Sequence, residues 1–144
     1  MTRRVVVTGI GLRTPAGHDV DTFWSTLVAG RSMAAPIENF DASEHPVKYA
    51  CEVKDFDAQA HFGFKEARRL DRAAQLGVAA AHDAVAQSFG DGGFASSGVD
   101  PARAGVLGGT GIGGLQTLED QIALYGEKGP TRVSPLLVPM MMAN

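Results

Sequence analysis

Short apolar runs that end in glycine turns alternate along this chain with segments of helical periodicity. The β-branched run at residues 3–8 is followed by Gly9 and Gly11, and the run at 104–108 leads into the glycine-rich residues 109–114. Both runs are typical of buried strands that leave a sheet through a tight turn. The alternation predicts a three-layer α/β fold with a mixed, mainly parallel sheet, built as one domain or as half of one.

The helical segments carry recognisable start and stop signals. Asp19 or Asp21 can cap a helix that ends at Gly30. Small residues dominate the apolar face of a long alanine-rich segment, so this helix is expected to lie close against a sheet or another helix. The remaining predicted elements are a short strand at 49–53, the long helix at 65–89 and a further helix at 115–125.

The charge balance limits the classes of function. The 144 residues include 13 lysines and arginines and 16 aspartates and glutamates, for a net charge of −3. This balance does not favour extensive binding of nucleic acid or of an anionic membrane. No apolar run reaches membrane-spanning length, and the run after Arg4 is too short for a secretory signal, so a cytoplasmic location is expected.

Reactive and metal-binding side chains are sparse. Cys51 is the only cysteine, which excludes an intrachain disulfide. Its sequence neighbours include acidic residues and no adjacent histidine, so nothing there would lower the pKa of its thiol. We therefore interpret Cys51 as a small buried strand residue rather than a nucleophile. The four histidines share no ligand spacing, and neither a metal site nor a cofactor is expected. These are His18, His45, His61 and His82.

The sequence GTGIGG at 109–114 matches the pattern G-x-G-x-x-G between a predicted strand and a predicted helix. A dinucleotide-binding motif also needs an acidic residue about 20 positions further on, after a second strand. Prolines occupy that region here, which makes nucleotide binding the less favoured interpretation. The glycines either let the backbone approach a narrow pocket or another chain, with Ile112 as the one projecting side chain, or form a simple tight turn.

A cluster of cations begins the predicted long helix. Lys65, Arg68, Arg69 and Arg72 fall on one helical face of a chain that is acidic overall. Such a face is either ordinary solvated surface or a docking site for an acidic partner.

Several separated segments occur in an order that carries more information than any one motif. Together they resemble the amino-terminal third of the elongating β-ketoacyl-acyl carrier protein synthases, above all the type II enzymes of fatty acid synthesis. The segments are RRVVVTGIGLRTPAGHDVDTFWSTLVAGRS, NFDAS, CEVKDFDA, KEARRLDRAAQLGVAAAHDAV, GTGIGGLQTLEDQ and RVSPLLVPMMMAN.

The resemblance implies a thiolase-like fold and an acyltransferase that condenses acyl and malonyl groups presented by acyl carrier protein. It implies a homodimer and a cysteine nucleophile beyond Asn144, so that residues 1–144 form the amino-terminal part of the synthase domain and are expected to be inactive alone. Cys51 does not match the nucleophile's setting. The alternatives are the ketosynthase of a polyketide synthase and a non-catalytic module that binds carrier protein.

The resemblance also assigns roles to residues of this chain. It implies that Ile112, with Gly111, lines the acyl-chain pocket and limits chain length. It places the apolar tail at 136–143 against the partner subunit's acyl pocket, through Leu137, Val138 and Met141. It assigns the docking of acyl carrier protein to a basic surface formed by Lys65, Arg68, Arg69 and Arg132.

Overall fold

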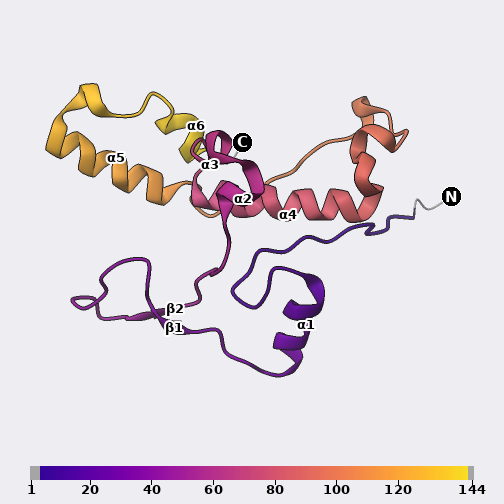
Figure 1. The fold of residues 1–144 in the computed structure, drawn as a ribbon, viewed down its shortest axis with the longest axis horizontal. Coiled ribbons are helices and arrows are strands. Elements are labelled where there is room, and N and C mark those ends of the chain that lie inside the picture. The colour runs from indigo at the N-terminus through magenta and orange to yellow at the C-terminus, as the bar shows by residue number, and fades with distance from the viewer. Residues whose placement is uncertain (1–3, 143–144) are drawn as a thin grey trace.

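The computed structural model describes residues 4–142 and consists of helices joined by long connecting segments. Helix α4 (Arg72–Phe89) occupies the middle of an elongated arrangement, and α5 (Leu115–Lys128) extends beyond the N-terminal end of α4 (Figure 1). The other helices are α1 (Val20–Val28), α2 (Ala58–Phe62), α3 (Phe64–Ala67) and α6 (Leu137–Met141), with 3-10 turns η1 (Gly90–Gly92), η2 (Phe94–Ser96), η3 (Pro101–Arg103) and η4 (Pro130–Arg132). No helix within residues 4–142 is both long enough and apolar enough to span a bilayer.

The mainly parallel sheet expected from the sequence is not confirmed. Within residues 4–142 the sheet consists of two short antiparallel strands, β1 (Ala35–Pro36) and β2 (Tyr49–Ala50). The runs predicted as strands at 3–8 and 104–108 form no ladder in their described part, and Val5, Val106 and Leu107 are 91%, 99% and 100% exposed. A strand needs neighbours for its backbone hydrogen bonds and apolar side chains, and neither run lies beside another strand here.

Helix α1 begins and ends where the capping residues predict. The Asp19 carboxylate accepts a hydrogen bond from the backbone N–H of Thr22 at 2.8 Å, and this bond lowers the pKa of Asp19. Gly30 follows the helix with a φ of 62°, a conformation that glycine adopts without strain.

The prediction of one long helix at 65–89 is wrong in one respect, because the structure has two separate helices there. Asp71 interrupts it with an extended ψ of 159°, and its carboxylate accepts a hydrogen bond from the backbone N–H of Ala73 at 2.9 Å. Asp71 is therefore the N-cap of α4, and α3 is a separate short helix before it. The predicted end is confirmed, since Gly90 follows α4 with a φ of 69°.

The small residues of α4 allow close approach of the chain, as predicted, although the neighbour is a connecting segment. A Cβ atom on Gly9 or Gly11 would overlap the carbonyl oxygen of Ala84 or Ala80 in α4. The N–H of Ile10 donates to Oε1 of Gln87 at 2.6 Å. These contacts fix the segment after the first apolar run along α4.

Candidate functional site

An apolar groove of about 330 Å³ lies between α4, the residues before the GTGIGG loop and the end of α6. Glycines, alanines and methionines form most of its wall, so it presents carbon surface and few polar groups. Its lining comprises Ala73, Ala74, Gly77, Val78, Ala81, residues 106–110, Gly113, Gly114 and residues 140–142.

Glycines 113 and 114 bring the GTGIGG loop against α6. The N–H of Gly114 donates to the carbonyl oxygen of Met141 at 2.8 Å. A Cβ atom on Gly114 would lie 2.8 Å from Cα of Met141 and 2.9 Å from the carbonyl oxygen of Met140. Within the loop, Oγ1 of Thr110 accepts a hydrogen bond from the N–H of Gly113 at 3.0 Å. The glycines therefore permit close approach to a neighbouring segment, as one of the sequence interpretations proposed.

A buried carboxylate lies behind this loop. Oδ2 of Asp71 accepts two hydrogen bonds from Thr117 in the first turn of α5, from the N–H at 3.1 Å and from the hydroxyl at 2.5 Å. The N-terminal end of α5 is thus occupied by a carboxylate of the protein. In a dinucleotide-binding motif the pyrophosphate takes that position, so the geometry argues against the nucleotide interpretation of GTGIGG.

The structure brings only part of the proposed acyl-chain residues into the groove. Met141 contributes to its wall, beside Gly113 and Gly114. Ile112 is 72% exposed at the tip of the loop, and Gly111 is also exposed. On α6, Leu137 is half-buried and Val138 is exposed, and neither lines the groove.

Sequence reasoning missed other residues of this site. Met140 and the run at 106–108 line the groove, and Asp71 with Thr117 supports it from behind. The small-residue face of α4 was a usable signal for the groove. No sequence signal joins Asp71 to Thr117, because 46 positions separate them.

The basic residues do not form one helical face, because Asp71 breaks the helix. Lys65, Arg68 and Arg69 lie exposed on α3 and the turn after it. Arg69 approaches Glu66 at 3.8 Å, and the guanidinium of Arg68 lies 5.3 Å from the centre of the Phe64 ring. These contacts leave the three cations at the surface.

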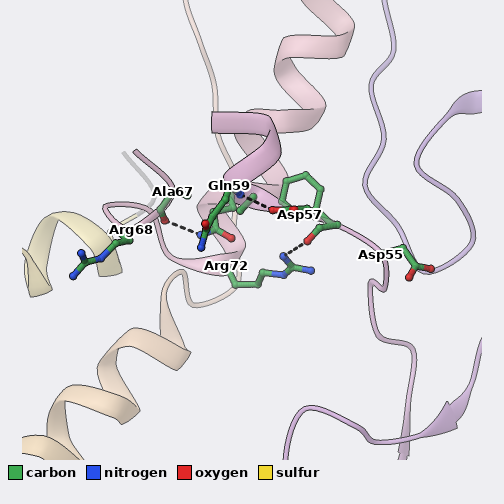
Figure 2. Close-up of a pocket in the computed structure, with 9 residues that line it drawn as sticks. Asp55, Asp57, Gln59, Ala67, Arg68 and Arg72 are labelled. Carbon is green, nitrogen blue, oxygen red and sulfur yellow. Dashed lines mark hydrogen bonds between the residues drawn. The ribbon is translucent and has the colours of Figure 1, made fainter. Parts of the chain in front are cut away.

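Arg72 has a different role from the three preceding cations. Its guanidinium donates to the carbonyl oxygens of Phe56 at 3.1 Å and Val53 at 3.3 Å, and lies over the Phe56 ring. Figure 2 shows its side chain directed toward the segment before α2, while Arg68 points away. Arg72 therefore fastens that segment to α4 and does not extend the basic face.

Arg68 and Arg72 line a wide depression of mixed charge, shown in Figure 2. Asp55 and Asp57 also line it, which offsets the two cations. Asp57 caps α2 by accepting from the N–H groups of Gln59 at 2.8 Å and Ala60 at 3.0 Å. This depression is suited less to an isolated anion than to a partner that carries charges of both signs.

The other candidate residues belong to other elements of the chain. Arg132 ends η4, after α5 and far along the chain from α3. The prediction that Cys51 is a buried strand residue is wrong, because β2 ends at Ala50 and Cys51 is exposed. Across the described residues 4–142, no three histidine, cysteine, aspartate or glutamate side chains are grouped so that they could hold a metal ion.

Comparison with known proteins identifies the family. The model of the family "Beta-ketoacyl synthase, N-terminal domain" matches residues 2–144. A 3-oxoacyl-[acyl-carrier-protein] synthase 2 from Synechocystis sp. is 44% identical over 142 residues, which are 99% of this chain and 33% of that protein. A granaticin polyketide putative beta-ketoacyl synthase 1 from Streptomyces violaceoruber is 40% identical, over 95% of this chain and 33% of that protein.

Comparison with solved structures gives a similar fold in the same class of protein. The solved structure of the ishigamide ketosynthase/chain length factor superposes with a TM-score of 0.75 at 30% identity, covering 98% of this chain and 34% of the solved chain. The chain thus spans about a third of the length of the relatives that it matches.

Proposed function

Because the chain belongs to the β-ketoacyl synthase family, as its N-terminal domain, we propose that it forms the amino-terminal part of an enzyme that elongates acyl chains. The reaction is the decarboxylative condensation of an acyl thioester with malonyl-acyl carrier protein in fatty acid biosynthesis. The observation that carries this proposal is the family match over residues 2–144, together with 44% identity to a 3-oxoacyl-[acyl-carrier-protein] synthase 2.

The chemistry divides into two steps. A cysteine thiolate, which we place beyond Asn144, attacks the acyl thioester, and the thiol of the carrier protein leaves. The malonyl thioester then loses carbon dioxide, and the resulting enolate carbon attacks the acyl carbonyl. A carbon–carbon bond forms, the acyl–sulfur bond breaks, and the cysteine thiolate is released.

In this reaction the chain supplies part of the acyl-chain wall. We assign that role to Gly111, Ile112, Leu137, Val138 and Met141. The hydrogen bond between Gly114 and Met141 supports the assignment, because it holds the loop with Ile112 against the tail helix. The apolar lining of the adjacent groove is suited to a hydrocarbon chain.

We assign the docking of acyl carrier protein, in its acyl and malonyl forms, to Lys65, Arg68 and Arg69, with Arg132. The exposure of the first three supports the assignment, because exposed cations steer an acidic partner toward the surface. The wide depression beside Arg68 offers room for contact at the edge of this surface.

The remaining parts of the proposal concern assembly and location. We propose that further polypeptide covers the exposed apolar runs, that residues 1–144 alone are inactive, and that the whole enzyme is a homodimer. Exposed runs such as Val106 and Leu107 support the first point, since apolar surface of this kind is normally buried. A cytoplasmic location stays a prediction from the sequence.

A second candidate is the ketosynthase of a polyketide pathway. The 40% identity to a granaticin polyketide putative beta-ketoacyl synthase favours it as an alternative. The two candidates share the condensation and differ in what happens to the product.

The test is a condensation assay with the whole enzyme, purified acyl- and malonyl-acyl carrier protein, and mass spectrometry of the product. The proposal expects a 3-oxoacyl carrier protein two carbons longer than the acyl donor, with one carbon dioxide released for each. Repeated reduction of the product by added reductive enzymes and renewed elongation identifies the fatty acid pathway, whereas elongation of unreduced 3-oxoacyl chains identifies the polyketide one. Binding of carrier protein without any condensation would contradict both.

A further inference from the structure

We infer that Asp71 and Thr117 are positioning residues that set the acyl chain-length preference, an inference that rests on the proposed function. Neither residue lies in the apolar groove or among the residues assigned to substrate. Their side chains are held behind the GTGIGG loop, and they act on the acyl chain only through that loop.

The first observation is the closure of two helix ends by one carboxylate. Asp71, which is 5% exposed, accepts from Ala73 at the start of α4 through Oδ1. Through Oδ2 it accepts from the N–H and the hydroxyl of Thr117 in the first turn of α5. Three donors on one buried carboxylate make a strong bridge, because hydrogen bonds to a charged acceptor are stronger than neutral ones.

The second observation is the position of Gly114. It is buried, and a Cβ atom on it would lie 3.0 Å from Cγ of Asp71 and 2.8 Å from Cα of Met141. The backbone is thus held between the carboxylate on one side and the end of α6 on the other. A shift in the first turn of α5 cannot leave Gly114 in place.

Ile112 lies two residues before Gly114, and the intervening Gly113 has a φ of 88°. The first part of the loop has few packing contacts, since no heavy atom other than those of chain neighbours lies within 4 Å of a Cβ atom on Gly109 or Gly111. Its placement therefore depends on what holds Gly114, which is the bridge between Asp71 and Thr117 on one side and the end of α6 on the other. If the bridge is weaker, Ile112 can move away from the acyl chain. The wall that limits long acyl chains then becomes less restrictive.

The experiment uses the whole enzyme and measures kcat/KM for a long and a short acyl-carrier protein. Thr117→Val removes the hydroxyl donor with little change in volume, and Thr117→Ser keeps it. Thr117→Val is expected to raise the ratio of long- to short-chain kcat/KM by about tenfold, the lower end of what one methylene group in an apolar pocket decides. Thr117→Ser and the exposed control Glu119→Gln are expected to leave the ratio unchanged.

If Thr117 only stabilises the fold, Thr117→Val lowers kcat/KM for the long and the short acyl donor by the same factor. That result, or a ratio that falls, overturns the inference. Hydrogen exchange gives a readout without substrate, and residues 109–114 are expected to exchange faster in Thr117→Val than in Thr117→Ser. Equal exchange in the two variants also overturns the inference.

Ile112→Ala, measured in parallel, distinguishes a failure of the bridge from a failure of the proposed acyl-chain wall. A changed ratio in Ile112→Ala with an unchanged ratio in Thr117→Val refutes the bridge and leaves the proposed acyl-chain wall standing. An unchanged ratio in Ile112→Ala removes the wall, and the inference with it. An unaltered enzyme that does not condense acyl and malonyl groups removes the proposed function itself.

Discussion

Gly114→Ala tests the close approach between the GTGIGG loop and α6. Gly114 is the centre of an inverse γ-turn, with a φ of −77° and a ψ of 62°, in which the N–H of Leu115 donates to the carbonyl oxygen of Gly113 at 2.9 Å. This turn is open to residues other than glycine, so the main effect of the substitution is steric. The added Cβ would lie 2.8 Å from Cα of Met141, 2.9 Å from the carbonyl oxygen of Met140 and 3.0 Å from Cγ of Asp71. Two of these neighbours are backbone atoms and the third belongs to a buried carboxylate, so none of them yields easily.

Overpacking of this kind costs about 1–3 kcal/mol, and the lower entropy of the unfolded chain returns about 0.4–1 kcal/mol. We therefore expect Gly114→Ala to reduce the free energy of unfolding by about 1–2 kcal/mol. Urea unfolding followed by circular dichroism measures it. The control is Gly126→Ala within α5, where the added Cβ meets no atom within 4 Å apart from the helix's own backbone and the two neighbouring residues, and alanine is expected to stabilise the helix by about 0.5–1 kcal/mol. Equal stability of the two variants would refute the steric reasoning.

Three further predictions concern the acyl-chain wall, the basic surface and the first helix. Ile112→Phe in the whole enzyme is expected to reduce kcat/KM for long acyl donors and spare short ones; an unchanged profile contradicts the assigned role. Arg68→Glu with Arg69→Glu is expected to raise the KM for acyl carrier protein at low salt, and the effect should shrink as the Debye length falls from about 30 Å at 0.01 M to about 8 Å at 0.15 M. Lys128→Glu, a reversal on the exposed end of α5, is the control. It changes the net charge by half as much as the double variant, so about half the effect there would show that only net charge matters. The pKa of Asp19 is lowered from 3.8 by the backbone hydrogen bond that it accepts, so its stabilisation of α1 is present above pH 3.8 and lost as the pH falls through the lower folded value. Hydrogen exchange in α1 should become faster as this stabilisation is lost. In Asp19→Asn the stability of α1 should no longer depend on pH in this range. A loss that persists in Asp19→Asn assigns the effect to another group.

Local signals predicted the ends of helices well. Asp19 before α1 and Gly90 after α4 act within one helical turn, so their effect can be read from neighbouring residues. The start of α5 at Leu115 was also predicted, and the helix continues to Lys128, three residues beyond the expected end. For α1 and α4 the hydrogen bonds that decide these boundaries lie within a few positions of them, whereas the first turn of α5 is held by Asp71, 46 positions away.

Non-local contacts account for the failures. Helix propensity predicts continuity through residues 65–89, because it contains no information on the N-cap bond that Asp71 accepts from Ala73 or on the bonds from Thr117 that also hold Asp71. Arg72 was placed on the basic face for the same reason, and its actual partners are carbonyl oxygens of Val53 and Phe56. The candidate site was predicted at the level of segments, the glycine loop and the tail, and their contact through Gly114 and Met141 required the structure.

The sheet is the most informative difference between sequence and structure. Both apolar runs that the sequence predicts as strands approach the same helix, one followed by Gly9 and Gly11 against Ala80 and Ala84, the other lining the groove beside α4. Figure 1 shows that the two segments run in the same direction along α4. Strands laid over one helix in a common direction are what a parallel sheet requires on one of its faces. The direction of the two segments along α4 is thus compatible with the predicted layer, but no ladder joins them within residues 4–142, and the parallel sheet stays a prediction. Each strand in such a sheet needs neighbours, so a ladder here would require further strands beside these two segments.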